Sequence, residues 1–199
     1  MARIYKIGKD ADKKINSLIK LTNEFYTITY KSKNALEYTV EYSFLEAFKT
    51  WENFVENSFS SHARYNDPVK GKRPYPYLAP KSEKHALELL TLEKDFIDWT
   101  SPDNIVSRAE VCFRNSAVIT GPIKRNMQDL RDMKKIRNHV AHGSKESERI
   151  FKELSRTRVG SAEIRGGKYL NYISPDGVNQ YSLYYLNLIK YLISKMSDI

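Results

Sequence analysis

The segment MKKIRNHVAHGS, residues 133–144, groups side chains whose chemistry suits the cleavage of a phosphodiester bond. Arg137, Asn138, His139 and His142 follow one another within about two helical turns, just before a glycine. Arginine offers a rigid fork that binds phosphate through two hydrogen bonds, and histidine can transfer protons near neutral pH. A base for the 2′-hydroxyl and a cation for the charge developing on phosphorus suffice for RNA cleavage without a metal. These residues therefore predict a metal-independent ribonuclease site.

A helical projection separates the two main candidates. At ~100° per residue, Arg137 falls on the apolar stripe of its helix, whereas His142 lies ~140° away from it. The stripe consists of Leu130, Met133, Ile136 and Val140. Either the helix unwinds at its end, or two copies of the segment meet across a twofold axis. We expect a combination of the two, which makes the site composite and the active protein a homodimer.

Other interpretations of the same residues stay open. Arg137 could form a salt bridge with Glu46 or Glu52 on another helix, since an arginine on an apolar face needs an anionic partner. A histidine at a helix C-terminus is also favoured by the helix dipole alone, which is the alternative for His142. Asn138 could hydrogen-bond His142 or bind a phosphate oxygen directly.

Further residues are weaker candidates for RNA binding. His139 is expected at the surface, where it could reach a phosphate or the second protomer. Lys134 and Lys135 would extend a phosphate-binding track towards Arg137. No cofactor is expected, and no metal, because His139 and His142 have no suitable third ligand nearby in the sequence.

The proline-rich stretch 66–80 is a long connection between helices. Proline fixes the backbone and removes a hydrogen-bond donor, so this stretch is expected to be irregular. It carries Lys72, Arg73 and Tyr75, and basic residues beside aromatic ones can hold a phosphate backbone and stack bases. The alternative is a solvated surface loop whose tyrosines pack against the protein.

Composition limits the class of protein. The chain has 199 residues, and 33 Lys and Arg against 24 Asp and Glu give it a net charge of +9, which suits a polyanionic partner such as RNA. Its single cysteine, Cys112, cannot form an internal disulfide. The N-terminal residues lack the apolar run of a signal peptide, and no apolar stretch is long enough to span a membrane. We therefore expect a cytoplasmic protein without membrane contact.

Hydrophobic periodicity predicts an all-α protein. Long helices are expected over residues 10–29 and 35–62, the second with a wide apolar face that makes it the central core helix. Ser101 and Ser144 are suited to cap helices at their N-termini, and Gly143 to end one. The remaining helices are predicted over 82–99, 102–114, 122–142, 145–156 and 179–196. A small β-hairpin is expected near residues 162–174, around Gly166 and Gly167.

The stretch RNHVAH resembles the signature of the HEPN superfamily: Arg137, a polar residue directly after it, and His142 after four intervening residues, near the end of a late helix. The resemblance implies a single helical domain over 1–199 with its motif-bearing core at about 35–156. It also implies dimerisation through the motif and metal-independent endoribonuclease activity, with Arg137 and His142 as the catalytic pair and Asn138 as their polar neighbour. HEPN toxins that a partner nucleotidyltransferase neutralises usually carry a tyrosine two residues after the histidine, where this chain has Ser144.

The leading hypothesis is therefore an endoribonuclease that cleaves single-stranded or tRNA-like RNA and leaves a 2′,3′-cyclic phosphate. It would act as a toxin or an anti-phage defence effector, with a possible antitoxin or defence-system partner. The alternative is a non-catalytic HEPN-like module that binds RNA or a partner protein. A third hypothesis is a structural subunit in which the motif is only a buried ion-pair network.

Overall fold

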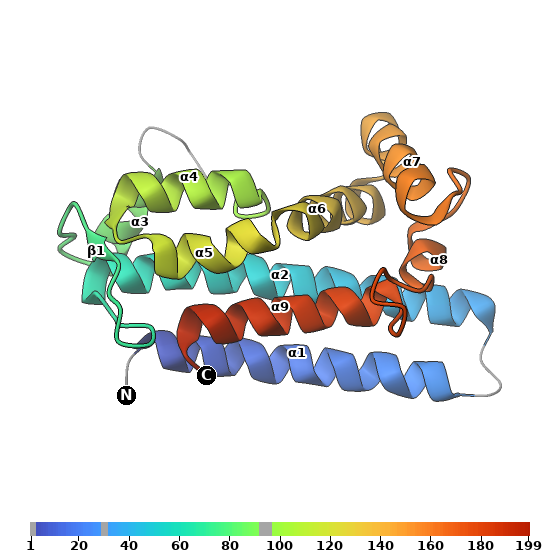
Figure 1. Cartoon of the computed structure of the whole chain (residues 1–199), viewed down its shortest axis with the longest axis horizontal. Coiled ribbons are helices and arrows are strands. Elements are labelled where there is room, and N and C mark those ends of the chain that lie inside the picture. Colours follow the sequence, from blue (N-terminus) through green and yellow to red (C-terminus); the bar gives the residue numbers. More distant parts are fainter. Residues whose placement is uncertain (1–2, 29–31, 92–96) are drawn as a thin grey trace. The chain divides into compact units, whose positions relative to one another are not determined.

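The computed structural model describes residues 3–28, 32–91 and 97–199, and helices make up most of it (Figure 1). The helices are α1 (Arg3–Thr27), α2 (Lys33–Tyr65), α3 (Glu83–Thr91), α4 (Pro102–Cys112), α5 (Ala117–Arg125), α6 (Met127–His142), α7 (Lys145–Val159), α8 (Gly166–Leu170) and α9 (Tyr181–Ser197). Two short strands, β1 (Tyr75–Pro76) and β2 (Phe113–Arg114), form an antiparallel pair. The predicted all-α class with a small β element is confirmed.

The chain divides into two compact units. Unit 1 comprises Met1–Lys13, Trp51–Leu130 and Tyr191–Ile199, and unit 2 comprises Lys14–Thr50 and Arg131–Lys190. Residues of α1, α2, α6 and α9 belong to both units. The segment that carries Arg137 and His142 lies in unit 2.

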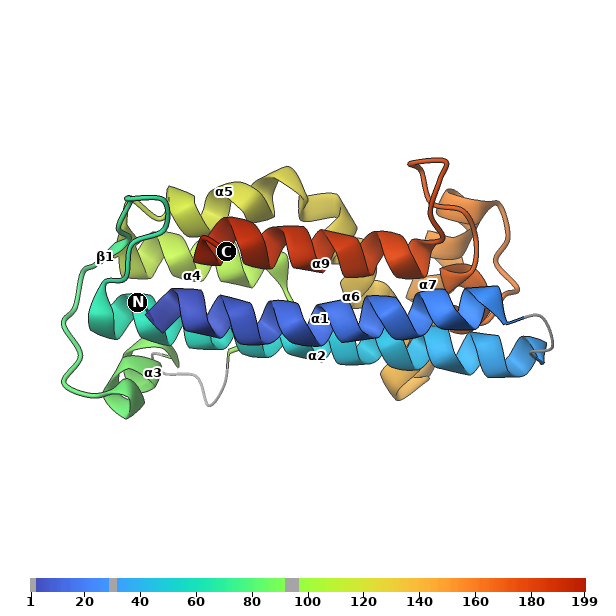
Figure 2. The same ribbon diagram turned by 90° about the horizontal axis from the view of Figure 1, so that it is seen from below.

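Unit 2 is held together by the apolar face of α2. Its buried positions recur at helical spacing and comprise Val40, Phe44, Ala47 and Phe48. The α9 residues Leu186 and Ile189 are fully buried in the same unit, and the rings of Phe44 and Tyr185 have their centroids 5.9 Å apart. Within this unit α8 lies beside the N-terminal part of α2, where Gly167 approaches Glu37, and α7 lies on the far side of α8 (Figures 1 and 2). The prediction of α2 as a core helix is confirmed.

In unit 1, α4 and α5 pack against each other. The N-terminus of α4 follows the prediction, since Ser101 accepts a hydrogen bond from the backbone of Asn104 and Pro102 is the first helical residue. Phe59 of α2 contacts Trp99 and Phe113, with ring centroids 4.8 and 5.6 Å away. These aromatic contacts form the centre of the unit 1 core.

The helix predicted over 122–142 is in fact two helices. α5 begins five residues earlier than Pro122, which lies inside it, and the chain leaves the helical conformation at Asn126 before α6 begins. Pro122 has no N–H to donate to Val118, so it weakens the helix without ending it at once. The side chain of Asn126 donates to the carbonyl of Pro122 over 2.8 Å and stabilises the break.

The hairpin predicted near 162–174 is wrong, because Gly166–Leu170 form the short helix α8. The two glycines allow α8 to pack closely against its neighbours, and they do not form a turn. A Cβ on Gly167 would lie 2.7 Å from the backbone oxygen of Glu37, and one on Gly166 would lie 2.5 Å from Val140. The antiparallel pair lies elsewhere, with Tyr75 opposite Arg114.

Two other predicted helices differ from the structure at their ends. The helix expected over 82–99 is described as α3 up to Thr91, and residues 97–100 are not helical. Its positions 92–96 lie outside the described residues, as does position 29 of the first predicted helix. That first helix begins at Arg3, earlier than expected, and ends at Thr27.

Candidate functional site

α6 places the motif at its own C-terminus. Leu130, Met133 and Ile136 are buried and anchor one face of the helix, while the last turn stays at the surface. Gly143 ends the helix as predicted, with a left-handed φ of 56° and its N–H donating to the carbonyl of His139 over 3.0 Å. His142 is therefore the last residue of α6, and its side chain is exposed to solvent.

Arg137 and His142 meet within one chain. Nη1 of Arg137 lies 2.7 Å from Nε2 of His142, and the same nitrogen donates to Oδ1 of Asn138 over 3.2 Å. The expectation that these two side chains cannot converge without unwinding or a second copy is wrong. α6 stays regular through His142, and the long arginine side chain spans the angle that separates the two Cβ directions.

The chemistry of the two groups decides which one donates in this contact. A guanidinium can only donate hydrogen bonds, so Nε2 of His142 is the acceptor. A cationic fork and a basic nitrogen thus lie side by side on an exposed helix end, and we call them the Arg–His pair. Both are groups that phosphodiester chemistry uses.

Asn138 has a role that differs from the one considered first. Its side-chain oxygen accepts from Arg137, so the structure pairs it with the arginine. Glu46, the alternative partner considered for Arg137, lies 3.0 Å from Lys14. The burial expected for Arg137 is only partial, because the residue is half-buried and its contact with His142 lies at the surface.

The helix that follows is fixed firmly to α6. Ser144 caps α7 as predicted, accepting from the backbone N–H of Ser147 over 3.2 Å. Arg158 near the other end of α7 donates from Nε and Nη2 to Oδ2 of Asp132 on α6, over 2.8 and 2.6 Å. Only 1% of the Asp132 side chain is exposed. This ion pair could not be predicted from the sequence, because no regular spacing links residues 132 and 158.

His139 is not the surface residue that was expected. Its ring stacks on Phe151 of α7, with centroids 4.1 Å apart and planes 3° from parallel. Burial lowers the pKa of His139 below its usual value, Glu148 opposes this, and Lys152 adds to it. The imidazole is therefore neutral near pH 7. Its Nδ1 is shielded from solvent and has no hydrogen-bond partner among the described residues.

The remaining candidates for RNA binding divide between the two units. Lys134 lies one turn before Arg137 on the same side of α6 and is half-buried. Lys135 is also half-buried, with Nζ 3.7 Å from Asp132. Both belong to unit 2, as do Arg137 and His142.

Lys72, Arg73 and Tyr75 are exposed and belong to unit 1, whereas Arg137 and His142 belong to unit 2. The stretch 66–80 is more ordered than its prolines suggested. Val69 and Lys72 exchange backbone hydrogen bonds across a tight turn, and Arg73 donates to the carbonyl of Asn66 over 2.9 Å. Both central residues of that turn have positive φ, which is typical of a two-residue hairpin turn.

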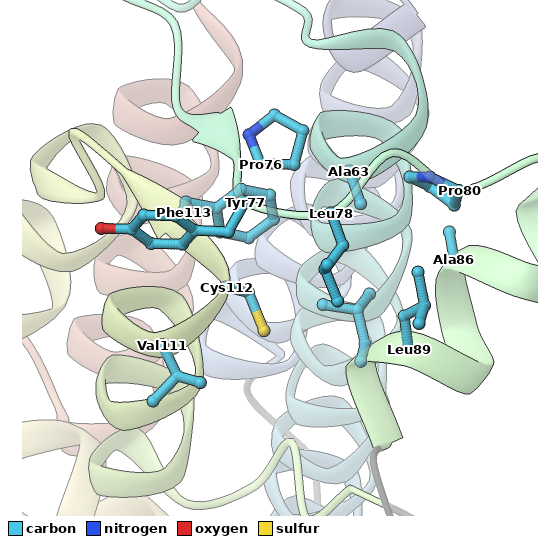
Figure 3. Close-up of a pocket in the computed structure, with 11 residues that line it drawn as sticks. Ala63, Pro76, Tyr77, Leu78, Pro80, Ala86, Leu89, Val111, Cys112 and Phe113 are labelled. Atoms are coloured by element: carbon cyan, nitrogen blue, oxygen red, sulfur yellow. The ribbon is translucent and has the colours of Figure 1, made fainter.

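Unit 1 also contains an apolar pocket (Figure 3). Its lining is almost entirely hydrophobic and comprises Ala63, Pro76, Tyr77, Leu78, Pro80, Ala86, Leu89, Leu90, Val111, Cys112 and Phe113. The sulfur of Cys112 lies among these side chains in Figure 3, and burial raises the pKa of its thiol. A thiol in this state is a poor nucleophile, so Cys112 behaves as a small packing residue.

Comparisons with known proteins add no relative. The chain matches no protein-family model, no curated protein and no solved structure. Within the described ranges, no helix combines the length and apolar character that crossing a membrane requires. The same residues hold no group of three or more His, Cys, Asp or Glu side chains placed to bind a metal ion. The Arg–His pair is therefore the arrangement from which a function can be argued.

Proposed function

We propose that this protein is a metal-independent endoribonuclease of the HEPN type that cleaves RNA with the Arg–His pair. One observation carries the proposal: a guanidinium nitrogen and an imidazole nitrogen lie 2.7 Å apart on an exposed helix end. The net charge of +9 favours the approach of a polyanion. The resemblance of RNHVAH to the HEPN signature supports the same reaction.

The reaction assigns one role to each side chain. Nε2 of His142 takes the proton of a ribose 2′-hydroxyl, and the 2′-oxygen attacks the adjacent phosphorus. The bond between phosphorus and the 5′-oxygen breaks, the leaving oxygen takes a proton from a water molecule and departs as a hydroxyl, and His142 then returns its extra proton to solvent. Arg137 stabilises the negative charge that develops on the non-bridging oxygens. The products are a 2′,3′-cyclic phosphate and a 5′-hydroxyl end.

Substrate binding has a further role, because it would break the contact between Arg137 and His142. Nε2 of His142 accepts from Arg137, so its lone pair is occupied until the guanidinium finds another acceptor. Phosphate oxygens are stronger acceptors for a guanidinium than a neutral imidazole, because they carry charge. A bound phosphodiester would therefore draw Arg137 away and leave the imidazole ready to take a proton.

The biological setting that we propose is a toxin or an anti-phage effector that works as a homodimer in the cytoplasm, with an antitoxin or another defence component as a possible regulator. The resemblance alone supports this setting. The dimer would bring two Arg–His pairs together along one RNA chain.

A non-catalytic RNA-binding or protein-interaction module is the second candidate. The observation that favours it is the same hydrogen bond, since a nitrogen that accepts from Arg137 cannot at the same time take a proton from a substrate. Such a module would keep the salt-sensitive RNA affinity of a basic protein and would leave the RNA intact.

A cleavage assay separates the two candidates. Labelled single-stranded RNA and tRNA are incubated with the protein in EDTA. We expect cleavage by the wild type, and a loss of about a hundredfold or more in His142→Ala and Arg137→Ala. Arg156→Ala is the matched control, because it removes one exposed positive charge from the same unit and should keep full activity. Intact RNA with every protein, together with retained binding, would favour the non-catalytic module.

A further inference from the structure

A surface groove lies beside α7 in unit 2. Along α7, Glu148, Phe151 and Lys152 form one wall at helical spacing, and residues 162–165 form the other. His139 of α6 closes the end, and the cavity measures about 260 Å³. This is enough space for a flat ring system. We call it the α7 groove.

The floor of the α7 groove is aromatic. His139 stacks on Phe151 with planes 3° from parallel, and Phe151 has no exposed surface. Phe151 lies beneath the half-buried His139, so a flat ring in the groove would stack on the face of His139 that does not meet Phe151.

The walls of the α7 groove carry alternating charges. Nζ of Lys152 lies 3.0 Å from Glu148 and 3.6 Å from Glu163. The Glu163 side chain is 82% exposed and holds Lys152 only loosely, so it can turn towards a ligand. A carboxylate and an ammonium group thus lie next to each other above an aromatic floor.

This pair of charges matches one base better than the others. The Watson–Crick edge of guanine presents O6, which accepts, beside N1–H and the N2 amino group, which donate. Lys152 can donate to O6 while Glu163 accepts from both nitrogens. On that edge adenine offers one amino donor beside one acceptor, cytosine one amino donor beside two acceptors, and uracil one donor between two acceptors, so none of them gives Glu163 two adjacent donor nitrogens. Guanine therefore makes the largest number of hydrogen bonds with this pair.

The α7 groove lies close to the Arg–His pair along α6. His142 follows His139 by three residues and is on the same side of the helix, ~4.5 Å further along its axis. A nucleotide whose base reaches His139 therefore has its phosphate within reach of the end of α6.

We propose that the α7 groove binds a guanine base of the RNA next to the phosphate that Arg137 contacts, with Glu163 and Lys152 reading its Watson–Crick edge. This inference rests on the proposed nuclease function. It predicts that cleavage occurs beside guanosine.

Binding of mononucleotides tests the groove without cleavage. The four nucleoside 3′-monophosphates share the phosphate and sugar, so differences in their affinity for the wild-type protein report on the base. By calorimetry or NMR titration we expect guanosine 3′-monophosphate to bind about tenfold more tightly than the other three. Glu163→Gln should remove this preference, because an amide offers only one acceptor oxygen. Glu146→Gln is the matched control, since Glu146 is an exposed α7 carboxylate outside the groove and pairs with Arg149.

Every result of these measurements supports or overturns the proposed guanine site. Equal affinity for all four nucleotides, no binding at all, or a preference that survives Glu163→Gln would overturn the proposal. Guanosine 3′-monophosphate binding by a protein that cleaves no RNA would support the groove and refute the nuclease. Cleavage without preference for guanosine would leave the nuclease standing and refute the groove.

Discussion

Nη1 of Arg137 donates to Nε2 of His142 over 2.7 Å, between two residues of one helix that are five positions apart. The contact needs no second copy of the chain and no unwinding of α6. Nε2 is the acceptor in this contact, because a guanidinium only donates hydrogen bonds. In the proposed reaction, this nitrogen is the base and the arginine is its resting partner.

Asn138 is expected to act as a positioning residue. Its side-chain oxygen accepts from Nη1 of Arg137 over 3.2 Å and so restrains the guanidinium. Asn138→Ala removes one hydrogen bond, worth about 1 kcal/mol, and should lower kcat/KM for RNA about fivefold. Asn138→Asp keeps an acceptor at that position and should retain more activity. Identical losses in the two variants would contradict a role through Arg137.

Mixing inactive variants tests whether each protomer carries a complete site. If the Arg–His pair of one chain acts alone, equal amounts of Arg137→Ala and His142→Ala protein should stay inactive after mixing. If two copies share one site, mixed dimers would regain one working site, and about a quarter of the wild-type activity would return. The contact within one chain leads us to expect no recovery. The measurement is the cleavage rate after joint refolding, with exchange of protomers verified by mass spectrometry.

The ion pair between Asp132 and Arg158 should matter for stability in an asymmetric way. The Asp132 side chain is 1% exposed and that of Arg158 is 30% exposed. Arg158→Ala leaves a buried carboxylate with Lys135 as a distant partner, and we expect it to lower the free energy of unfolding by about 3 kcal/mol. Asp132→Asn leaves an arginine that can reach solvent, so its effect should be smaller, about 1 kcal/mol.

Urea denaturation measures both effects. Arg149→Ala is the control, because it breaks an exposed pair with Glu146 on the same helix and should leave the unfolding midpoint unchanged. A greater loss in Asp132→Asn than in Arg158→Ala would contradict the assignment of Asp132 as the buried partner.

Acid should destabilise the protein through His62 in unit 1. Burial lowers the pKa of His62 to about 4, and the contact of its Nδ1 with the carbonyl of Asp67 opposes this only in part. The unfolded chain takes up a proton near pH 6.5, whereas the folded chain does so only near pH 4, so protonation favours unfolding between these values. Its contribution falls as the pH drops through this range, by up to about 3 kcal/mol. His62→Gln should flatten the pH dependence of the urea midpoint there, and an unchanged slope would contradict this account.

Much of the fold follows from local sequence signals. The repeated apolar positions of α2 identify the core helix, and Ser101, Ser144 and Gly143 mark helix ends because their side chains or backbone freedom suit those positions. These signals depend on neighbours within a few residues. They remain valid whatever the tertiary packing.

The errors arise where tertiary contacts decide. Gly166 and Gly167 suggested a turn, yet Gly167 is needed because α8 closely approaches the backbone of α2 at Glu37, and Gly166 because the Val140 side chain of α6 lies as close. The break at Asn126 depends on how Pro122 is accommodated inside α5. The helical projection of α6 represents only the direction in which each Cβ leaves the helix, so it does not account for the length of the Arg137 side chain. Glu163 and the other groove residues that follow α7 in the sequence belong to no motif, so they could not be predicted as part of a site.

The chemistry of the cleaved ends tests the central claim most directly. An RNA with one ribose replaced by 2′-deoxyribose is incubated with the wild-type protein in EDTA beside the all-ribose RNA, and the ends are identified by mass spectrometry. The Arg–His mechanism predicts 2′,3′-cyclic phosphate and 5′-hydroxyl ends in the all-ribose RNA, no such ends with His142→Ala, and no cut after the deoxyribose. Ends with a free 3′-hydroxyl, or cleavage at the deoxyribose as fast as elsewhere, would contradict it.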